Sequence, residues 1–113
     1  MIKDPLVFIE HIWESIELIE GYLKNKNADD FLESTQLQDA VIRRLEIMGE
    51  AVKNIPEDYT RKYPGLPWKE LARTRDKLAH GYFGVDLELV WEITQNDLKE
   101  LKKQIMTLRK TSL

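Results

Sequence analysis

The chain has 113 residues, a length that indicates one domain spanning residues 1–113, with enough residues to bury a core. It contains no cysteine, which excludes disulfides and thiolate chemistry and agrees with a reducing cytoplasm. Its net charge of -3 argues against a protein that holds DNA or RNA by bulk electrostatics. No apolar run is long enough to span a membrane, so we expect neither a signal peptide nor a membrane anchor.

The charge is unevenly placed along the chain. Residues 1–40 carry 3 Lys or Arg against 9 Asp or Glu, whereas residues 41–80 carry 9 against 6. The basic middle third leaves room for a local phosphate-binding surface on an acidic protein.

Helical periodicity dominates the chain from its start. Asp4 followed by Pro5 predicts a helix N-cap and first turn. Apolar residues then recur every three or four positions on one face, at Ile9, Ile12, Ile16, Ile19 and Leu23. Gly21 and the polar run "KNKNADD" are expected to end this helix.

Two further helices are predicted before the middle of the chain. A short helical turn is expected around residues 31–32, opened by Asp29 or Asp30. A long helix should begin near Ser34 or Thr35. Its apolar positions are Leu37, Val41, Leu45, Met48, Val52 and Ile55.

Proline and glycine divide the second half of the chain. Pro56 ends the long helix and opens a connector, "PEDYTRKYPGLP", with room for one helical turn. Pro67 suits the first turn of another helix, which Gly81 and Gly84 should break, and Asp86 can cap a last helix. The apolar stripe of that last helix continues through Leu98, Leu101, Ile105 and Leu108. The predicted fold is all-α, an up-and-down bundle of about four main helices.

The stretch "RTRDKLAHGYFGVD" (residues 73–86) combines a cation, an imidazole and a phenol at a helix end. In the helix from Pro67, the apolar register runs Trp68, Leu71, Arg75 and Leu78. Arg75 therefore takes a core position, and an unpaired buried charge is costly. An ion pair with Glu46 or Glu50 of the neighbouring long helix would be the ordinary structural explanation.

His80 follows Arg75 by five residues, about 140° around a continuing helix. The two side chains can share a site only if the helix unwinds at His80 or if two copies of the chain combine their residues. Each also has a structural interpretation: His80 suits the negative end of the helix dipole, and Tyr82 suits the edge of the bundle. His11 stands alone on a solvated helix face.

The inventory of side chains excludes several chemistries. Two histidines without cysteine or a His-Glu-x-x-His pattern leave no credible metal site. The chain also lacks a phosphate-binding glycine loop and a nucleophile elbow. The carboxylates of the first helix, Glu10, Glu14 and Glu17, are more simply a solvated face. An Arg–His pair still suffices for RNA cleavage without metal or cofactor, because a ribose 2′-OH can attack its own phosphate.

Three stretches resemble one known family. These are "DAVIRRLEIMGEAVK" (39–53), "YPGLPWKELARTRDKLAHGYFGVD" (63–86) and "VWEITQNDLKELKKQI" (90–105). They are similar to the HepT-like toxins of the HEPN (higher eukaryotes and prokaryotes nucleotide-binding) superfamily, and the likeness extends to the opening "DPLVFIEHIWESIELIE". Arg-x4-His-x-Tyr, placed after "PW" and before "FGVD", is much more specific than Arg-x4-His alone.

The resemblance implies a cytoplasmic toxin of a type VII (HepT/MntA-like) toxin–antitoxin pair. It implies a homodimer whose motifs converge at a shared cleft and cleave RNA without metal. It assigns catalysis to Arg75 and His80, a supporting polar role to Asp76, and modification to Tyr82. The implied partner is a minimal nucleotidyltransferase antitoxin that silences the toxin by adding AMP to Tyr82.

The sequence leaves one alternative function open. The alternative is a non-catalytic helical partner of a nucleotidyltransferase, which the acidic balance favours slightly. A dimer is expected because exposed aromatics such as Trp13 and Trp91 suggest more apolar surface than one small bundle can bury.

Overall fold

The computed structural model describes residues 4–79 and 86–111, with side chains described for 4–74 and 86–111. Over these ranges the chain is helical and contains no strand, which confirms the predicted all-α bundle. The helices in chain order are α1 (Pro5–Tyr22), α2 (Ala28–Glu33), α3 (Thr35–Asn54), α4 (Glu57–Lys62), α5 (Trp68–Ala79), α6 (Leu87–Glu92) and α7 (Leu98–Thr111), with a π-helical turn η1 (Ile93–Asp97) between α6 and α7. None of the described helices is long and apolar enough to cross a membrane.

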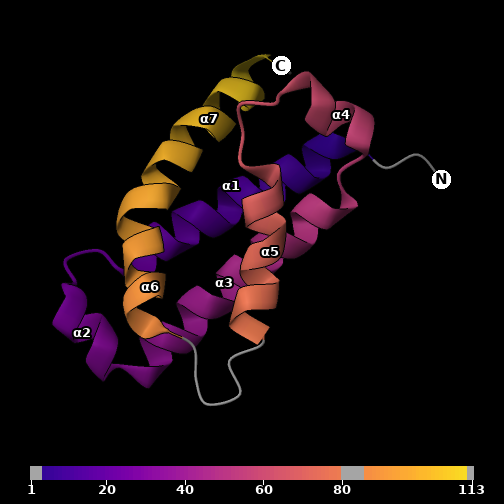
Figure 1. Ribbon diagram of the computed structural model, residues 1–113. Helices are drawn as coiled ribbons and strands as arrows, with labels where there is room; N and C mark the ends of the chain where they lie inside the picture. The colour runs from indigo at the N-terminus through magenta and orange to yellow at the C-terminus, as the bar shows by residue number, and fades with distance from the viewer. Residues whose placement is uncertain (1–3, 80–85, 112–113) are drawn as a thin grey trace.

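The four long helices form the body of the molecule. α1 packs along α3 and α7, and α3 packs in turn along α5. Successive main helices run in opposite directions, with α5 and α7 together on one side of the α1–α3 pair (Figure 1). The order around the bundle is therefore α5, α3, α1, α7. The four helices do not form a closed ring, because α5 and α7 make few contacts with each other over their described residues.

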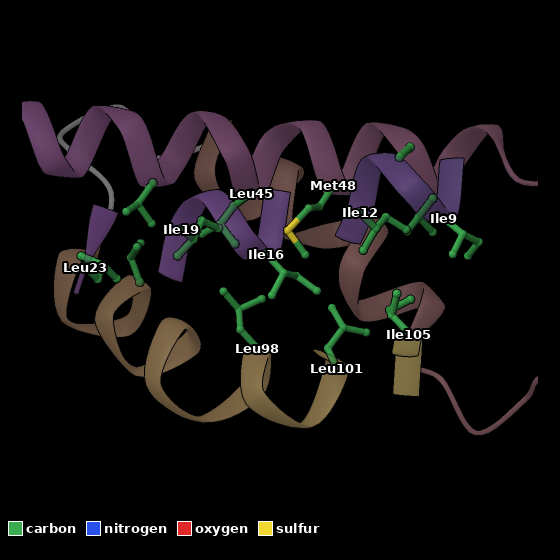
Figure 2. Packing of buried hydrophobic residues seen from close by; sticks show 14 of the residues in the cluster. Ile9, Ile12, Ile16, Ile19, Leu23, Leu45, Met48, Leu98, Leu101 and Ile105 are labelled. Carbon is green, nitrogen blue, oxygen red and sulfur yellow. The ribbon is translucent and has the colours of Figure 1, made fainter. Parts of the chain in front are cut away.

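The core lies where α1 faces both α3 and α7. Figure 2 shows the side chains of these three helices pointing toward one another. The core residues are at most 8% exposed. From α1 they include Ile9, Ile12, Ile16, Ile19 and the C-cap residue Leu23; from α3, Val41, Leu45, Met48 and Val52; and from α7, Leu98, Leu101, Ile105 and Leu108. The apolar rows predicted for the first and last helices are confirmed.

Helix starts follow the predicted caps in three cases. The side chains of Asp4, Ser34 and Asp86 accept hydrogen bonds from the backbone N–H groups of the first turns of α1, α3 and α6. Each bond satisfies a donor that the helix itself cannot pair. The connector after Pro56 holds the six-residue α4, slightly more than the single turn predicted.

The start of α2 differs from the prediction. The N-cap is Asn27, and neither Asp29 nor Asp30 opens the helix. Asn27 Oδ1 accepts from the Asp30 N–H at 2.8 Å, and Asp30 Oδ2 accepts from the Asn27 N–H at 2.9 Å. Asp30 is therefore the third residue of a reciprocal capping box, where its carboxylate also faces the positive end of the helix.

The last helix is interrupted by a π turn, a feature that periodicity did not reveal. Val90, Thr94 and Leu98 all lie in the core and are spaced by four residues. A step of four overshoots one α-helical turn by about 40°, so two successive steps would rotate Leu98 off the core face. The π turn holds more residues per turn, and its Leu98 N–H bonds to the Ile93 carbonyl, so all three residues stay buried.

Trp13 and Trp91 are not the exposed aromatic residues that the sequence predicts. Both pack against the core and are half-buried. The Trp91 ring lies 5.7 Å from that of Phe31. The Trp13 ring is covered by two cations of α7, the Arg109 guanidinium at 4.4 Å and the Lys102 ammonium at 5.6 Å. These rings stabilise one copy of the chain, so they give no support for a dimer.

Trp13→Ala should therefore destabilise the folded monomer. We expect the free energy of unfolding to fall by about 2 kcal/mol, less than for a fully buried tryptophan. Val7→Ala, on the same helix at a side chain that is 48% exposed, is the control and should change it by under about 0.5 kcal/mol. Urea unfolding measures both. Wild-type stability in Trp13→Ala, together with loss of self-association, would show instead that Trp13 belongs to an interface.

Candidate active site at the end of α5

α5 is fixed at its start by two contacts from the connector. The indole N–H of Trp68 donates to the Tyr63 carbonyl at 2.9 Å, and the Leu71 N–H donates to the Pro67 carbonyl at 3.0 Å. Trp68 and Leu71 are half-buried against the core, on the side of α5 that packs along α3. These contacts set the position from which the helix runs toward the Arg-x4-His-x-Tyr motif.

The motif lies at the limit of the described residues. Arg75 and Asp76 belong to the described backbone of α5, which runs to Ala79, but their side chains lie outside the described part. His80 and Tyr82, like Gly81 and Gly84, fall in residues 80–85, which the structure does not describe. The predicted ion pair of Arg75 with Glu46 or Glu50 and the predicted meeting of Arg75 with His80 stay predictions.

A cleft of about 340 Å³ lies beside the same helix, and no sequence pattern predicts it. Its floor is formed by Leu45 and Met48 of α3, and its sides by α5 on one edge and η1 with α7 on the other. The remaining lining residues are Pro67, Glu70, Leu71, Thr74, Ile93, Asp97, Leu98, Glu100, Leu101 and Gln104. Thr74, which immediately precedes Arg75, belongs to this lining, so the cleft reaches the motif helix next to the predicted catalytic arginine.

Among the described residues, the charged side chains that line the cleft are all carboxylates. Three carboxylates, those of Glu70, Asp97 and Glu100, belong to its lining and are exposed. Exposed cations on the flanking helices, such as Lys69 and Arg73 of α5 and Lys99 and Lys103 of α7, are not part of this lining. At one end the Gln104 amide donates to the Gly65 carbonyl at 2.9 Å and ties α7 to the connector before α5.

The remaining titratable candidates take structural positions. His11 is exposed, and its ring meets Phe8 edge-on at 6.1 Å. Glu10, Glu14 and Glu17 are exposed as predicted, and Glu10 also accepts a 2.7 Å bond from Arg109 of α7. Among the side chains described, no three His, Asp or Glu residues gather in a way that could hold a metal ion.

Comparison with known proteins assigns the family. A family model described as Ribonuclease HepT-like matches residues 12–108, which include α5 and the whole motif. The chain belongs to this family. No solved structure gives a match.

The similar proteins carry names that agree with this family. A "Probable ribonuclease HepT" of Thermococcus cleftensis is 50% identical over 103 residues, covering 91% of this chain and 94% of that protein. A "Putative RNase" of Caldanaerobacter subterraneus subsp. tengcongensis is 42% identical over 103 residues, covering 91% and 92%. A "Gamma-glutamylcyclotransferase and putative RNase" of Methanocaldococcus jannaschii is 54% identical over 108 residues, covering 96% of this chain, which spans about half of that longer protein (49%).

Proposed function

We propose that this HepT-like chain, taken as one domain over residues 1–113, is an endoribonuclease and the toxin of a type VII toxin–antitoxin pair acting in the cytoplasm. The observation that carries the proposal is the intact pattern Arg75-x4-His80-x-Tyr82, which begins on α5 inside the region matched by the ribonuclease family. The names of the similar proteins support RNA as the substrate.

The proposed reaction uses the RNA's own ribose as nucleophile. The 2′-oxygen forms a bond to the adjacent phosphorus while the bond from phosphorus to the 5′-oxygen breaks. His80 moves the proton from the 2′-OH and a proton reaches the leaving 5′-oxygen, while Arg75 stabilises charge on the phosphoryl oxygens. Asp76 would support the motif as a polar neighbour. The products are a 2′,3′-cyclic phosphate and a 5′-OH, and no metal or cofactor takes part.

The spacing of the motif residues supports a homodimer. Five residues separate Arg75 from His80, about 140° around a continuing helix, so one helix alone would not direct both toward one phosphate. Two copies that bring their motifs together would supply both groups to a shared cleft. The dimer is thus part of the proposed catalytic site.

Control by a nucleotidyltransferase antitoxin is the second part of the proposal. The Tyr82 oxygen would attack the α-phosphate of ATP, and pyrophosphate would leave. The attached AMP brings bulk and a negative phosphate two residues from His80, where it would compete with RNA for Arg75.

A non-catalytic partner of a nucleotidyltransferase is the second candidate function. The net charge of -3 and the three carboxylates of the cleft favour it, because both weaken the attraction for RNA phosphates. The motif would then serve binding only, and substitution of His80 would leave RNA turnover unchanged.

His80→Ala should abolish cleavage of RNA by the purified protein. Proton transfer by a positioned side chain contributes about 10²–10⁴-fold to a rate. Arg75→Ala should lose nearly as much activity, and Arg75→Lys should recover only part of it, because an ammonium lacks the planar donor fork of guanidinium.

The measurement is cleavage of total RNA in the presence of EDTA, with mass analysis of the product ends. His11→Ala is the matched control, since that exposed histidine should be dispensable. Wild-type cleavage by His80→Ala would favour the non-catalytic partner, and cleavage that stops in EDTA would contradict the metal-independent reaction.

Tyr82→Phe should escape covalent silencing. After incubation of wild type with the cognate nucleotidyltransferase and ATP, intact-mass analysis should show one added AMP per chain, on the peptide containing Tyr82. The phenylalanine variant should gain no mass and should stay active unless it is held by tight binding alone. Tyr59→Phe serves as the control and should be modified like wild type. Equal modification and silencing of Tyr82→Phe would exclude Tyr82 as the switch.

A further inference from the structure

Lys69 and Arg73 form a row of exposed cations on α5, the helix that packs along α3 and carries the motif (Figure 1). They are four residues apart, so their side chains lie on one face of the helix. Leu71, which packs against the core, is two residues from each and therefore about 160° around the helix from both. The row faces away from the core. Among the described side chains, neither cation takes part in an ion pair.

The electrostatics of an isolated helix do not favour this row. Like charges four residues apart repel each other across one turn. Lys69 is also the second residue of α5, at the positive end of the helix dipole, where a carboxylate is favoured and a cation is not. The basic residues in the last turn of α7, Arg109 and Lys110, are placed as the dipole favours. The row therefore costs α5 stability, and a bound polyanion would offset that cost.

The row is in register with the motif histidine. His80 follows Lys69 by eleven residues and Arg73 by seven, and both spacings are close to whole numbers of helical turns. A helix extended by one residue past Ala79 would bring position 80 within about 20° of both cations, over about 16 Å of helix length. Arg75, by contrast, is about 160° from Arg73, toward the core side. A strand bound along the row would thus be directed at the residue that is proposed to move the proton.

Neighbouring surfaces repel RNA or have their cations already paired. The charged groups lining the cleft are carboxylates, which repel phosphate. α1 carries four Glu, and α2 carries two Asp and one Glu, with no Lys or Arg in either helix. α7 is basic, but two of its cations pair with α1, Lys102 with Glu20 and Arg109 with Glu10, each at 2.7 Å. These charges favour an approach of RNA along the outward face of α5.

We propose that Lys69 and Arg73 bind phosphates of the RNA strand next to the cleaved bond and align that strand with His80. The inference rests on the proposed ribonuclease and adds substrate-positioning residues outside the Arg-x4-His-x-Tyr motif. The chemistry recognised is the sugar–phosphate backbone, so the row adds affinity without selecting a base sequence. Two cations on a chain of net charge -3 give weak binding that depends strongly on salt.

The salt dependence of RNA binding tests the row directly. The double variant Lys69→Gln with Arg73→Gln removes both charges and keeps side chains that suit a helix. Lys99→Gln with Lys103→Gln is the matched control, because it removes two exposed cations that are also four residues apart, from α7. The probe is a short fluorescein-labelled 2′-O-methyl RNA, which lacks the nucleophilic hydroxyl and stays intact. Fluorescence anisotropy over a series of NaCl concentrations gives the dissociation constants.

Loss of two phosphate contacts should make the plot of log affinity against log salt less steep by about 1.4, since each contact with a single strand contributes about 0.7. We also expect the dissociation constant at low salt to rise about tenfold. The α7 control and the charge-preserving variant Lys69→Arg with Arg73→Lys should keep the wild-type slope. A wild-type slope in the α5 glutamine variant, or a reduced slope in the α7 control instead, would overturn the inference.

Cleavage of unmodified RNA separates this inference from the proposed function. The α5 glutamine variant should raise KM while kcat stays close to that of wild type, because Arg75 and His80 are unchanged. A lower kcat with an unchanged KM would show that the row does not act by binding substrate, and circular dichroism checks that the variant folds. Wild-type protein that binds the probe through the row but cleaves no RNA would contradict the proposed ribonuclease and support the phosphate-binding row.

Discussion

Four isoleucines of α1, at positions 9, 12, 16 and 19, are at most 1% exposed and lie between α3 and α7. Burial of one such side chain contributes roughly 1.5–3 kcal/mol, so this row supplies much of the energy that orders the bundle. α3 is held against the row on one side, and α5 is held against α3 in turn. The position of the Arg75 backbone on α5 therefore depends on the packing of α3 against α1.

Much of the fold could be predicted from the sequence, because it depends on local signals. The caps at Asp4, Ser34 and Asp86 need only neighbouring backbone N–H groups. Asn27 was missed because three polar residues that can cap a helix follow one another closely there, and the reciprocal bond to Asp30 decides among them. The sequence does not predict the burial of Trp13, because the cations that cover its ring come from α7, about ninety positions later in the chain.

The candidate site also has one part that could be predicted from the sequence and one part that could not. The motif residues Arg75, His80 and Tyr82 are contiguous enough for a sequence pattern, together with a family resemblance, to single them out. The cleft beside them was not predictable, since its lining comes from α3, α5, η1 and α7 and exists only after these elements pack. The π turn, which places Ile93 and Asp97 on that lining, corrects a register conflict that is visible only once the buried faces are known.

The central claim is that two copies of the chain build one catalytic site, and mixing two inactive variants tests it most directly. Arg75→Ala and His80→Ala are each purified, unfolded together, refolded to exchange subunits, and assayed on RNA with EDTA present. A mixed dimer retains one Arg75 and one His80, on different copies. If the site is shared, the mixture should regain a substantial fraction of wild-type cleavage while each variant alone stays inactive. If mixed dimers form but show no cleavage, the Arg75 and His80 of one site do not come from different copies, and the account of a shared cleft is contradicted.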